Sequence, residues 1–381
     1  MTEYCYQVCL LGYRSSHADE IKHYLIECLA DLGLPEEYIV FLNKEDVHSR
    51  NRKAPCAVVF SGYSDAPKNA HPELDGLIED SVLIVPIVED LAKFGENVPS
   101  KIKHFNGVDG VLGWKIACIS ILEYFKLLRS ERRLFISYKR SETTSIAHQL
   151  YEAFDSRGYD VFLDTRSVPV GDIFQNVLWH RMADSDVVVL LDSPSFHQSK
   201  WTEKEYARAM ASKIHVEHLL WPGVVSTSTA AFDQFAPIEK SDFETIDIIG
   251  NAARFTNSVI DKIVNDVESS RARALAARNA NIIDDFCDLA REYGFKADLQ
   301  PGHSIQLLTG KQEIAVVPMV GVPTALRLYK LFTKRPGDEV WALFESLGIM
   351  EDVVTHIAWL NQNLPMTAVP KKDIRSVLEG L

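Results

Sequence analysis

This chain of 381 residues lacks most of the features that mark secreted, metal-binding or membrane proteins. Its six cysteines include no C-x-x-C pair and no histidines at zinc-finger spacing, so we expect reduced, buried thiols and no metal site. The N-terminus does not show the basic and then apolar layout of a signal peptide. The most apolar long window, residues 111–128, contains Lys115, Glu123 and Lys126, which excludes a membrane span. Together these absences predict a cytoplasmic protein.

An excess of basic residues is also absent, because the formal net charge is −13. General binders of nucleic acid or of anionic membranes need a basic surface, so neither partner is expected. The charge leaves room for a local basic pocket that holds a phosphorylated small molecule. A chain of this length exceeds the usual size of one hydrophobic core, so we expect two or three domains.

What the chain does contain is organised around Leu134–Gly223. Buried-strand patterns at 134–138, 159–164 and 186–192 alternate with helical patterns, which predicts a parallel sheet covered on both faces. In open sheets of this kind, ligands bind outside the carboxyl ends of the strands. We therefore expect the polar residues just past those ends to surround one crevice. They are Tyr138, Lys139, Arg140, Asp164, Thr165, Arg166 and Ser193.

Residues 1–110 also have an α/β pattern, with apolar strands at 6–13, 39–42, 57–60 and 81–88 and an amphipathic helix at 21–32. This order repeats roughly that of Leu134–Gly223, and we interpret it as a diverged duplication, although residue identity between the two halves is slight. The first half has no equivalent of Trp201 and Glu205. As a duplicate it is expected to have lost any chemistry.

The remaining segments are assigned by pattern. Residues 111–133 are predicted to form a linker helix followed by a basic run, and 224–280 a surface loop (224–243) followed by a connector helix (256–278). Residues 281–381 are predicted to form a small α+β domain. Its expected helix is 281–293, its strands are 295–299, 304–308 and 313–318, and two or three further helices follow at 323–332, 338–347 and 351–360. Sensing or assembly is its expected role.

Three motifs in Leu134–Gly223 resemble those of a bacterial TIR (Toll/interleukin-1 receptor) domain. Phe135–Tyr138 is similar to the family's first strand, and Phe162–Asp172 to its second strand and the following loop. Ser193–Trp201 followed by Glu205 is similar to its serine-containing loop, tryptophan and helix glutamate. The family usually has cysteine directly after the tryptophan, where this chain has Thr202. The resemblance implies a flavodoxin-like parallel sheet at 134–223. If residues 1–110 are a duplicate of it, we expect a TIR-like or Rossmann-like α/β domain there, degenerate in its motifs.

The resemblance also implies an activity. TIR domains that keep the helix glutamate are NAD⁺ hydrolases or cyclases that cut the nicotinamide–ribose bond, and members without it tend to be adaptors. It therefore implies that NAD⁺ is a substrate, that no cofactor is needed, and that TIR domains associate with one another. A bacterial anti-phage effector or signalling enzyme, activated by assembly, is the expected class. The alternative is a non-catalytic interaction scaffold in which Glu205 is incidental.

The proposed chemistry needs one carboxylate. In NAD⁺ the leaving nicotinamide is a cationic ring and becomes neutral as it departs. No general acid is therefore required to protonate it, unlike in ordinary glycosidases. An ionised Glu205 would hydrogen-bond the ribose hydroxyls and stabilise the developing oxocarbenium charge. Glu205 lies four residues after Trp201, on the same helical face, whereas Glu203 points well away. The alternative interpretation of Glu205 is an ordinary surface carboxylate that pairs with Arg208.

The other substrate-binding candidates each have two interpretations. Trp201 either stacks on nicotinamide or anchors the start of its helix in the core. Lys139 and Arg140 pair with the pyrophosphate or are solvated loop charges. Tyr138 stacks on the adenine or ribose, or packs beneath the loop.

The loop after the second strand supplies three further candidates. Asp164 accepts from a ribose hydroxyl or caps the loop's own amides. Arg166 and Gly171 lie in a loop that, in this family, moves and contacts neighbouring domains, so Arg166 is a substrate contact or an assembly contact. The histidines His148, His180 and His197 have no motif support and are expected to be structural or surface residues.

Overall fold

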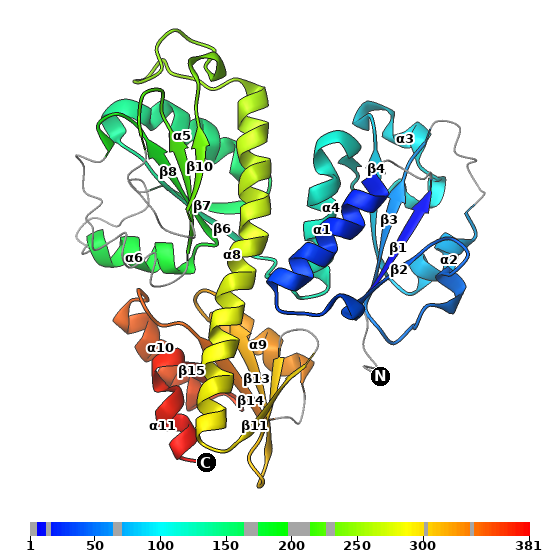
Figure 1. Cartoon of the computed structure of the whole chain (residues 1–381), viewed down its shortest axis with the longest axis vertical. Helices are drawn as coiled ribbons and strands as arrows, with labels where there is room; N and C mark the ends of the chain where they lie inside the picture. The colour runs from blue at the N-terminus through cyan, green and yellow to red at the C-terminus, as the bar shows by residue number, and fades with distance from the viewer. Residues whose placement is uncertain are drawn as a thin grey trace. The chain divides into compact units, whose positions relative to one another are not determined.

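A computed structural model of the chain describes residues 6–12, 17–63, 71–163, 174–196, 214–225, 233–300, 304–335 and 339–381. The chain divides into two compact units, residues 1–130 and 131–381. Among the helices described, none combines the length and the hydropathy needed to cross a bilayer. Figure 1 shows the elements along the chain.

The first unit is built on a five-stranded sheet in which all strands are parallel. The strands are β1 (Tyr6–Gly12), β2 (Ile39–Leu42), β3 (Cys56–Ser61), β4 (Leu83–Val88) and β5 (Val108–Asp109). Their order in the sheet is β2-β1-β3-β4-β5. This is the flavodoxin-like order, in which the strand order reverses between β1 and β3. Apolar runs such as 56–61, buried at every position, are what a sheet covered on both faces requires.

Helices cover both faces of this sheet. The helices are α1 (His17–Asp31), α2 (Glu73–Glu79), α3 (Phe94–Asn97) and α4 (Gly110–Tyr124). Helices α1 and α4 pack against each other and on one face, and α2 covers the opposite face with Leu74 and Leu77 (Figure 1). The helix expected to begin a linker at residue 111 is therefore α4, which is part of the first unit's core. The cysteines described in this unit, Cys9 and Cys56 among them, are buried free thiols.

The second unit begins with another five-stranded parallel sheet. Its strands are β6 (Arg132–Ser137), β7 (Tyr159–Leu163), β8 (Val187–Asp192), β9 (His215–Leu220) and β10 (Asp233–Pro237). They lie in the order β10-β9-β8-β6-β7. Counted within this sheet, that order is again 2-1-3-4-5. The parallel α/β sheet expected for 134–223 is confirmed, and its edge strand β10 lies in the segment that was predicted to be a surface loop.

The two faces of this sheet have separate cores. Helix α5 (Arg140–Asp155) and the first half of α8 (Asn257–Glu292) cover one face, where Ile146, Leu150 and Val264 pack against Leu191. Helix α6 (Phe174–Asp184) covers the other face, where Leu178 and Met182 pack with Phe135, Phe162 and Phe196. Successive strand residues alternate between these cores, as the pleat of a strand requires.

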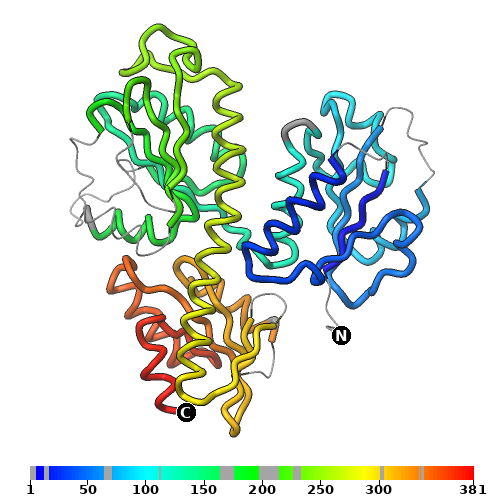
Figure 2. Tube along the Cα trace, viewed as in Figure 1, coloured from blue at the N-terminus to red at the C-terminus, as the bar shows by residue number. Residues whose placement is uncertain are grey.

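Helix α8 connects this sheet to the last one. Its 36 residues form one continuous helix (Figure 2), where the sequence predicted two. Ile263 and Val264 pack on the second sheet, whereas Ile283 and Phe286 pack on the third. Between these two regions, the buried guanidinium of Arg278 donates to the carbonyls of Ser185 (2.7 Å) and Ala183 (2.8 Å), at the end of α6. The helix therefore contributes to both cores and to the contact between them.

The third sheet is mixed. Its strands β11 (Lys296–Gln300), β12 (Ser304–Leu308), β13 (Glu313–Met319), β14 (Glu339–Phe344) and β15 (Thr367–Pro370) lie in sequence order. The pairs β11–β12 and β12–β13 are antiparallel, and β13–β14 and β14–β15 are parallel. Helix α8 and α11 (Ile374–Glu379) cover one face, and α9 (Ala325–Lys334) and α10 (Glu351–Asn361) cover the other.

The helix predicted over 338–347 is wrong, because residues 339–344 form the inner strand β14. Its run Val340–Phe344 is buried at every position, on both faces of the sheet. A short continuous apolar run has no periodicity that separates a buried helix turn from a buried strand. The contacts to β13 and β15, which are distant in sequence, decide between them.

Candidate functional site

The carboxyl ends of β6 and β8 meet where the strand order of the second sheet reverses, and ligands bind at such points in open α/β sheets. In the register of this pair, Ser137 of β6 lies level with Leu190 of β8. Because β8 continues to Asp192, the loop that follows it begins beside Lys139. The residues after these two strands are therefore brought together, as the sequence analysis expected for this edge.

Lys139 and Arg140 lie at the first turn of α5. The Lys139 ammonium donates to the carbonyl of Ser195 (2.8 Å), in the loop after β8. Arg140 is exposed at the start of the helix. Tyr138 is only 5% exposed and packs in the core under α5. Of these three predicted substrate residues, Arg140 presents its side chain to solvent, Lys139 contacts the neighbouring loop, and Tyr138 is a packing residue in this structure.

Glu142, which none of the sequence motifs indicated, belongs to the same contact. Its carboxylate accepts a hydrogen bond from the backbone N–H of Ser195 (3.1 Å). Burial favours the neutral form of this carboxyl, but the nearby Ser193 and Ser195, with the Ser195 N–H bond, and the charge of Lys139 outweigh that effect and hold its pKa below the usual value. Glu142 is therefore ionised at neutral pH and balances the charge of Lys139.

A second polar group missed by the sequence analysis lies inside the sheet. The imidazole of His218, in β9, lies between two buried carboxylates: Nδ1 is 2.7 Å from Asp192 and Nε2 is 3.4 Å from Asp233. Phe235 stacks on the same ring at a centroid distance of 4.7 Å. Burial lowers the pKa of His218, but the hydrogen bond to Asp192 and the negative charges of Asp192 and Asp233 outweigh it and raise the pKa to about 9.

One signal in the sequence points to this group. The strand His215–Leu220 places Glu217 and His218 at consecutive positions between the apolar Val216 and Leu219, and ionisable residues are almost never fully buried unless they are paired. Glu217 and His218 face opposite sides of the sheet, and Ser270 of α8 contacts the Glu217 carboxylate at 3.5 Å. The identity of each partner depends on strand order, which no local pattern reveals.

The remaining predicted site residues lie outside the described part of the chain. These are Asp164, Arg166, Gly171, Trp201 and Glu205. Phe196, the last residue described before Trp201 and Glu205, is buried against Phe135 and Phe162 at the carboxyl end of the sheet. Across the described residues, no group of three His, Cys, Asp or Glu side chains is arranged to hold a metal ion.

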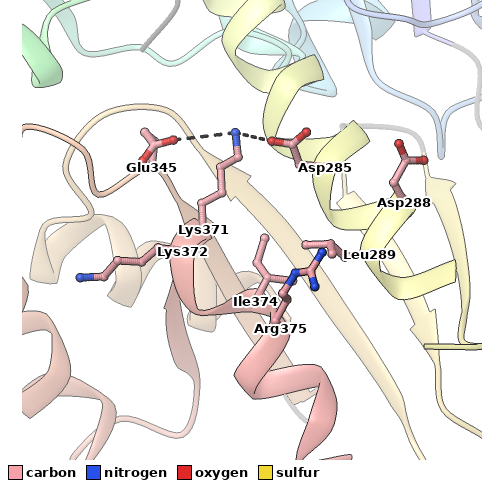
Figure 3. A pocket seen from close by; sticks show the side chains of 8 residues that line it. All are labelled: Asp285, Asp288, Leu289, Glu345, Lys371, Lys372, Ile374 and Arg375. Atoms are coloured by element: carbon pink, nitrogen blue, oxygen red, sulfur yellow. Dashed lines mark ion pairs between the residues drawn. The ribbon is translucent and has the colours of Figure 1, made fainter. Parts of the chain in front are cut away.

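An open hollow of about 450 Å³ lies beside the third sheet, between α8 and the start of α11. Figure 3 shows the Lys371 ammonium pointing between Asp285 (2.5 Å) and Glu345 (3.8 Å). Its other charged side chains include Asp288 and Arg375, which pair with Arg291 (2.9 Å) and Glu292 (3.6 Å). These side chains are paired within the protein, and Lys372 also lines the hollow, so side chains of both signs surround it and neither ligand charge is favoured.

The second sheet thus defines a class of protein: a flavodoxin-order α/β domain with polar loops gathered at its strand-order reversal. Residues 134–264 match the family model described as the TIR domain. A curated relative, the 2' cyclic ADP-D-ribose synthase BtTIR of Bacteroides thetaiotaomicron, is 25% identical over 88 residues. That alignment covers 23% of this chain and 31% of the relative, so this chain spans about a third of that protein's length.

Residues 134–264 of this chain therefore form a TIR domain, as the three motifs indicated. The family match extends beyond residue 223 to include β10 and the start of α8. A D-lactate dehydrogenase from Sporolactobacillus sp. is similar over 76% of this chain and 97% of its own, at 12% identity. Its TM-score of 0.21 is too low to carry an argument about fold or function.

Proposed function

We propose that the TIR domain cleaves the nicotinamide–ribose bond of NAD⁺, with Glu205 as the carboxylate that stabilises the ribose as the ring departs. The observation that carries this proposal is the TIR match at 134–264, together with a relative named as a cyclic ADP-ribose synthase. The spacing of Trp201 and Glu205 adds the residue that this chemistry requires. The reversal point between β6 and β8 offers the edge at which a dinucleotide would bind.

The chemistry follows from the leaving group. The pyridinium ring takes the bonding electrons and leaves as neutral nicotinamide, so one ionised carboxylate beside the ribose is sufficient. Attack by water at the anomeric carbon then gives ADP-ribose. Attack by a hydroxyl or by the adenine of the same molecule gives a cyclic product, and exclusion of water from the site favours it.

The direct test is release of nicotinamide from NAD⁺ by the full-length protein, with products resolved by mass. We expect Glu205→Ala and Glu205→Gln to lose activity by at least about a hundredfold, because removing one charge-stabilising group typically costs that much or more. Glu203→Gln, two residues away on the same predicted helix, is the matched control and should stay within a few-fold of wild type. No release by wild-type protein at any concentration would favour the scaffold function instead.

The proposal includes activation by assembly, as an effector or signalling enzyme in bacterial defence. If TIR domains complete the site in pairs, activity per molecule rises with protein concentration. We expect a more than linear dependence of nicotinamide release on concentration, together with a shift to larger species in sedimentation. A specific activity that is constant over a hundredfold range of concentration would contradict assembly without contradicting catalysis.

A further inference from the structure

Two side chains from the first turn of α5 hold opposite sides of one residue in the loop after β8. Lys139 Nζ donates to the carbonyl of Ser195 (2.8 Å), and the N–H of Ser195 donates to Glu142 (3.1 Å). Both polar groups of this loop residue's backbone are thus bonded by side chains of opposite charge. We call this arrangement of Lys139, Glu142 and Ser195 the α5 clamp.

The backbone at the base of the clamp makes several hydrogen bonds, although α5 is kinked at Thr143 (φ −130°, ψ 19°). Lys139 caps α5, and its carbonyl accepts hydrogen bonds from the N–H groups of Glu142 (3.0 Å) and Thr143 (2.9 Å). Thr143 is fully buried beneath this turn. The carbonyl of Glu142 also accepts from the N–H of Gly250 (2.6 Å), in the loop after β10. The backbone that presents the two side chains is therefore tied down on several sides.

The described start of the loop after β8, residues 193–196, is anchored by Phe196. The N–H of Phe196 donates to the carbonyl of Ser193 (2.9 Å), and the ring of Phe196 is buried in the core under α6. The clamp and this ring together fix the position of residues 195 and 196. Glu205 lies nine residues after Phe196 in the sequence.

We propose that Lys139 and Glu142 are positioning residues for the NAD⁺ reaction, because they fix Ser195, ten residues before Glu205 in the sequence. This inference rests on the proposed function. It gives Lys139 a role other than pairing with the pyrophosphate, since its ammonium already bonds the Ser195 carbonyl and lies near the ionised Glu142. Misplacement of a reacting group by about 1 Å can cost on the order of a hundredfold in rate, so loss of the clamp is expected to lower kcat.

Kinetics separate positioning from substrate binding. We expect Lys139→Met and Glu142→Ala each to lower kcat for nicotinamide release by about ten- to a hundredfold, with KM for NAD⁺ within about threefold of wild type. Lys139→Arg and Glu142→Gln, which keep a donor and an acceptor, should recover most of the activity. The double variant Lys139→Met/Glu142→Ala should be no slower than the slower single variant, because both act on one contact.

Matched controls are Glu152→Ala, an exposed glutamate later in α5, and Lys262→Met, an exposed lysine in α8, which should leave both constants unchanged. A raised KM with an unchanged kcat in Lys139→Met would show that this lysine binds substrate, and would overturn the proposal. So would activity in Glu142→Gln as low as in Glu142→Ala.

Amide hydrogen exchange tests the clamp without relying on activity. In Glu142→Ala and Lys139→Met, we expect the Ser195 amide and the peptide that runs to Glu205 to exchange at least about tenfold faster, with core strands β6 and β8 unchanged. If these variants exchange like wild type, the clamp does not position this segment and the inference fails. If exchange rises but wild-type protein releases no nicotinamide, the proposed function fails and the clamp stands as a structural contact alone.

Discussion

At the scale of single residues, His218 shows how a parallel sheet enforces an ionisation state. Its ring lies between Asp192 and Asp233, and all three side chains are almost completely buried. A cation there offsets two carboxylates that would otherwise repel each other in a medium of low dielectric constant. The pKa of about 9 means that His218 remains protonated throughout the neutral range.

The raised pKa of His218 makes the free energy of unfolding depend on pH. The pKa of His218 is raised from 6.5 in the unfolded chain to about 9, so its contribution is fully present below about pH 6.5 and is lost as pH rises to about 9. We expect His218→Gln to cost on the order of 2–3 kcal/mol of unfolding free energy at about pH 6 and much less at about pH 9.5. Urea unfolding of the two proteins across this range measures the difference.

The exposed His356 provides the control. In His356→Gln, the loss of unfolding free energy should be small and should not vary across the same pH range. A cost for His218→Gln that is equally large at both ends of that range would show that the ring acts through packing alone.

At the scale of elements, α6 has close contacts with the loops after β13 and β14. The N–H of Val322, after β13, donates to Asp184 at the end of α6 (2.8 Å), and the N–H of Met350, after β14, lies 3.4 Å from Nδ1 of His180. Burial, with Arg181 and Arg133 nearby, lowers the pKa of His180 and favours the neutral ring, which can accept a hydrogen bond at Nδ1. The TIR domain is thus joined to the third sheet by hydrogen bonds from two loops.

A glycine in the loop after β14 makes this approach possible. Gly348 has φ +84°, and a Cβ there would lie 3.2 Å from the Cβ of Ala183 and 3.3 Å from the carbonyl oxygen of Trp179. Both of those residues belong to α6. The loop therefore meets α6 through a turn at which a side chain would require its neighbours to shift by a few tenths of an ångström.

Substitution of two glycines separates the cost of this contact from the cost of backbone conformation. Gly294, after α8, has φ +77° with nothing within 4 Å of the position that a Cβ would occupy, so Gly294→Ala should cost only about 1–2 kcal/mol of unfolding free energy. Gly348→Ala should cost about 1–3 kcal/mol more, because it also overpacks the contact with Trp179 and Ala183. Thermal and urea unfolding measure both. Equal losses would mean that the loop moves away from α6 without cost.

At the scale of the whole molecule, three sheets belong to two units. The first unit has its own core around α2, whereas the second and third sheets share α8. At about 1.5 Å per residue, the 36 residues of α8 are long enough to reach both sheets as one continuous helix. Breaking its packing on one sheet removes support from the other. The two units therefore should unfold separately, and the two sheets on α8 together.

Three alanine substitutions test this organisation by calorimetry. Leu74, Leu191 and Leu307 are fully buried, one in each sheet's core. Each Leu→Ala change should cost about 2–5 kcal/mol, which lowers a transition by several degrees. We expect Leu74→Ala to lower one transition, and Leu191→Ala and Leu307→Ala to lower the other. A separate transition that responds only to Leu307→Ala would show that α8 does not couple the two sheets.

The same scales explain which parts of the site were predictable. Strands such as β4 and β8 are continuous apolar runs bounded by turns, and hydrophobic burial acts on such runs wherever they lie in the chain. The polar residues that follow β6 were predicted to gather with those after β8, and Lys139 does contact Ser195. Glu142 was not selected, because a glutamate in the first turn of a helix ordinarily stabilises the helix dipole and is exposed.

The sequence by itself determined the alternation of strands and helices, the TIR motifs and the candidate carboxylate Glu205, because local periodicity and motif spacing are properties of neighbouring residues. The tertiary structure alone decided that β10 and β14 are strands, that α8 is shared by two sheets, and that His218 lies between two carboxylates. Each of these depends on contacts between residues far apart in the chain. Only the folded order of the strands brings such residues together.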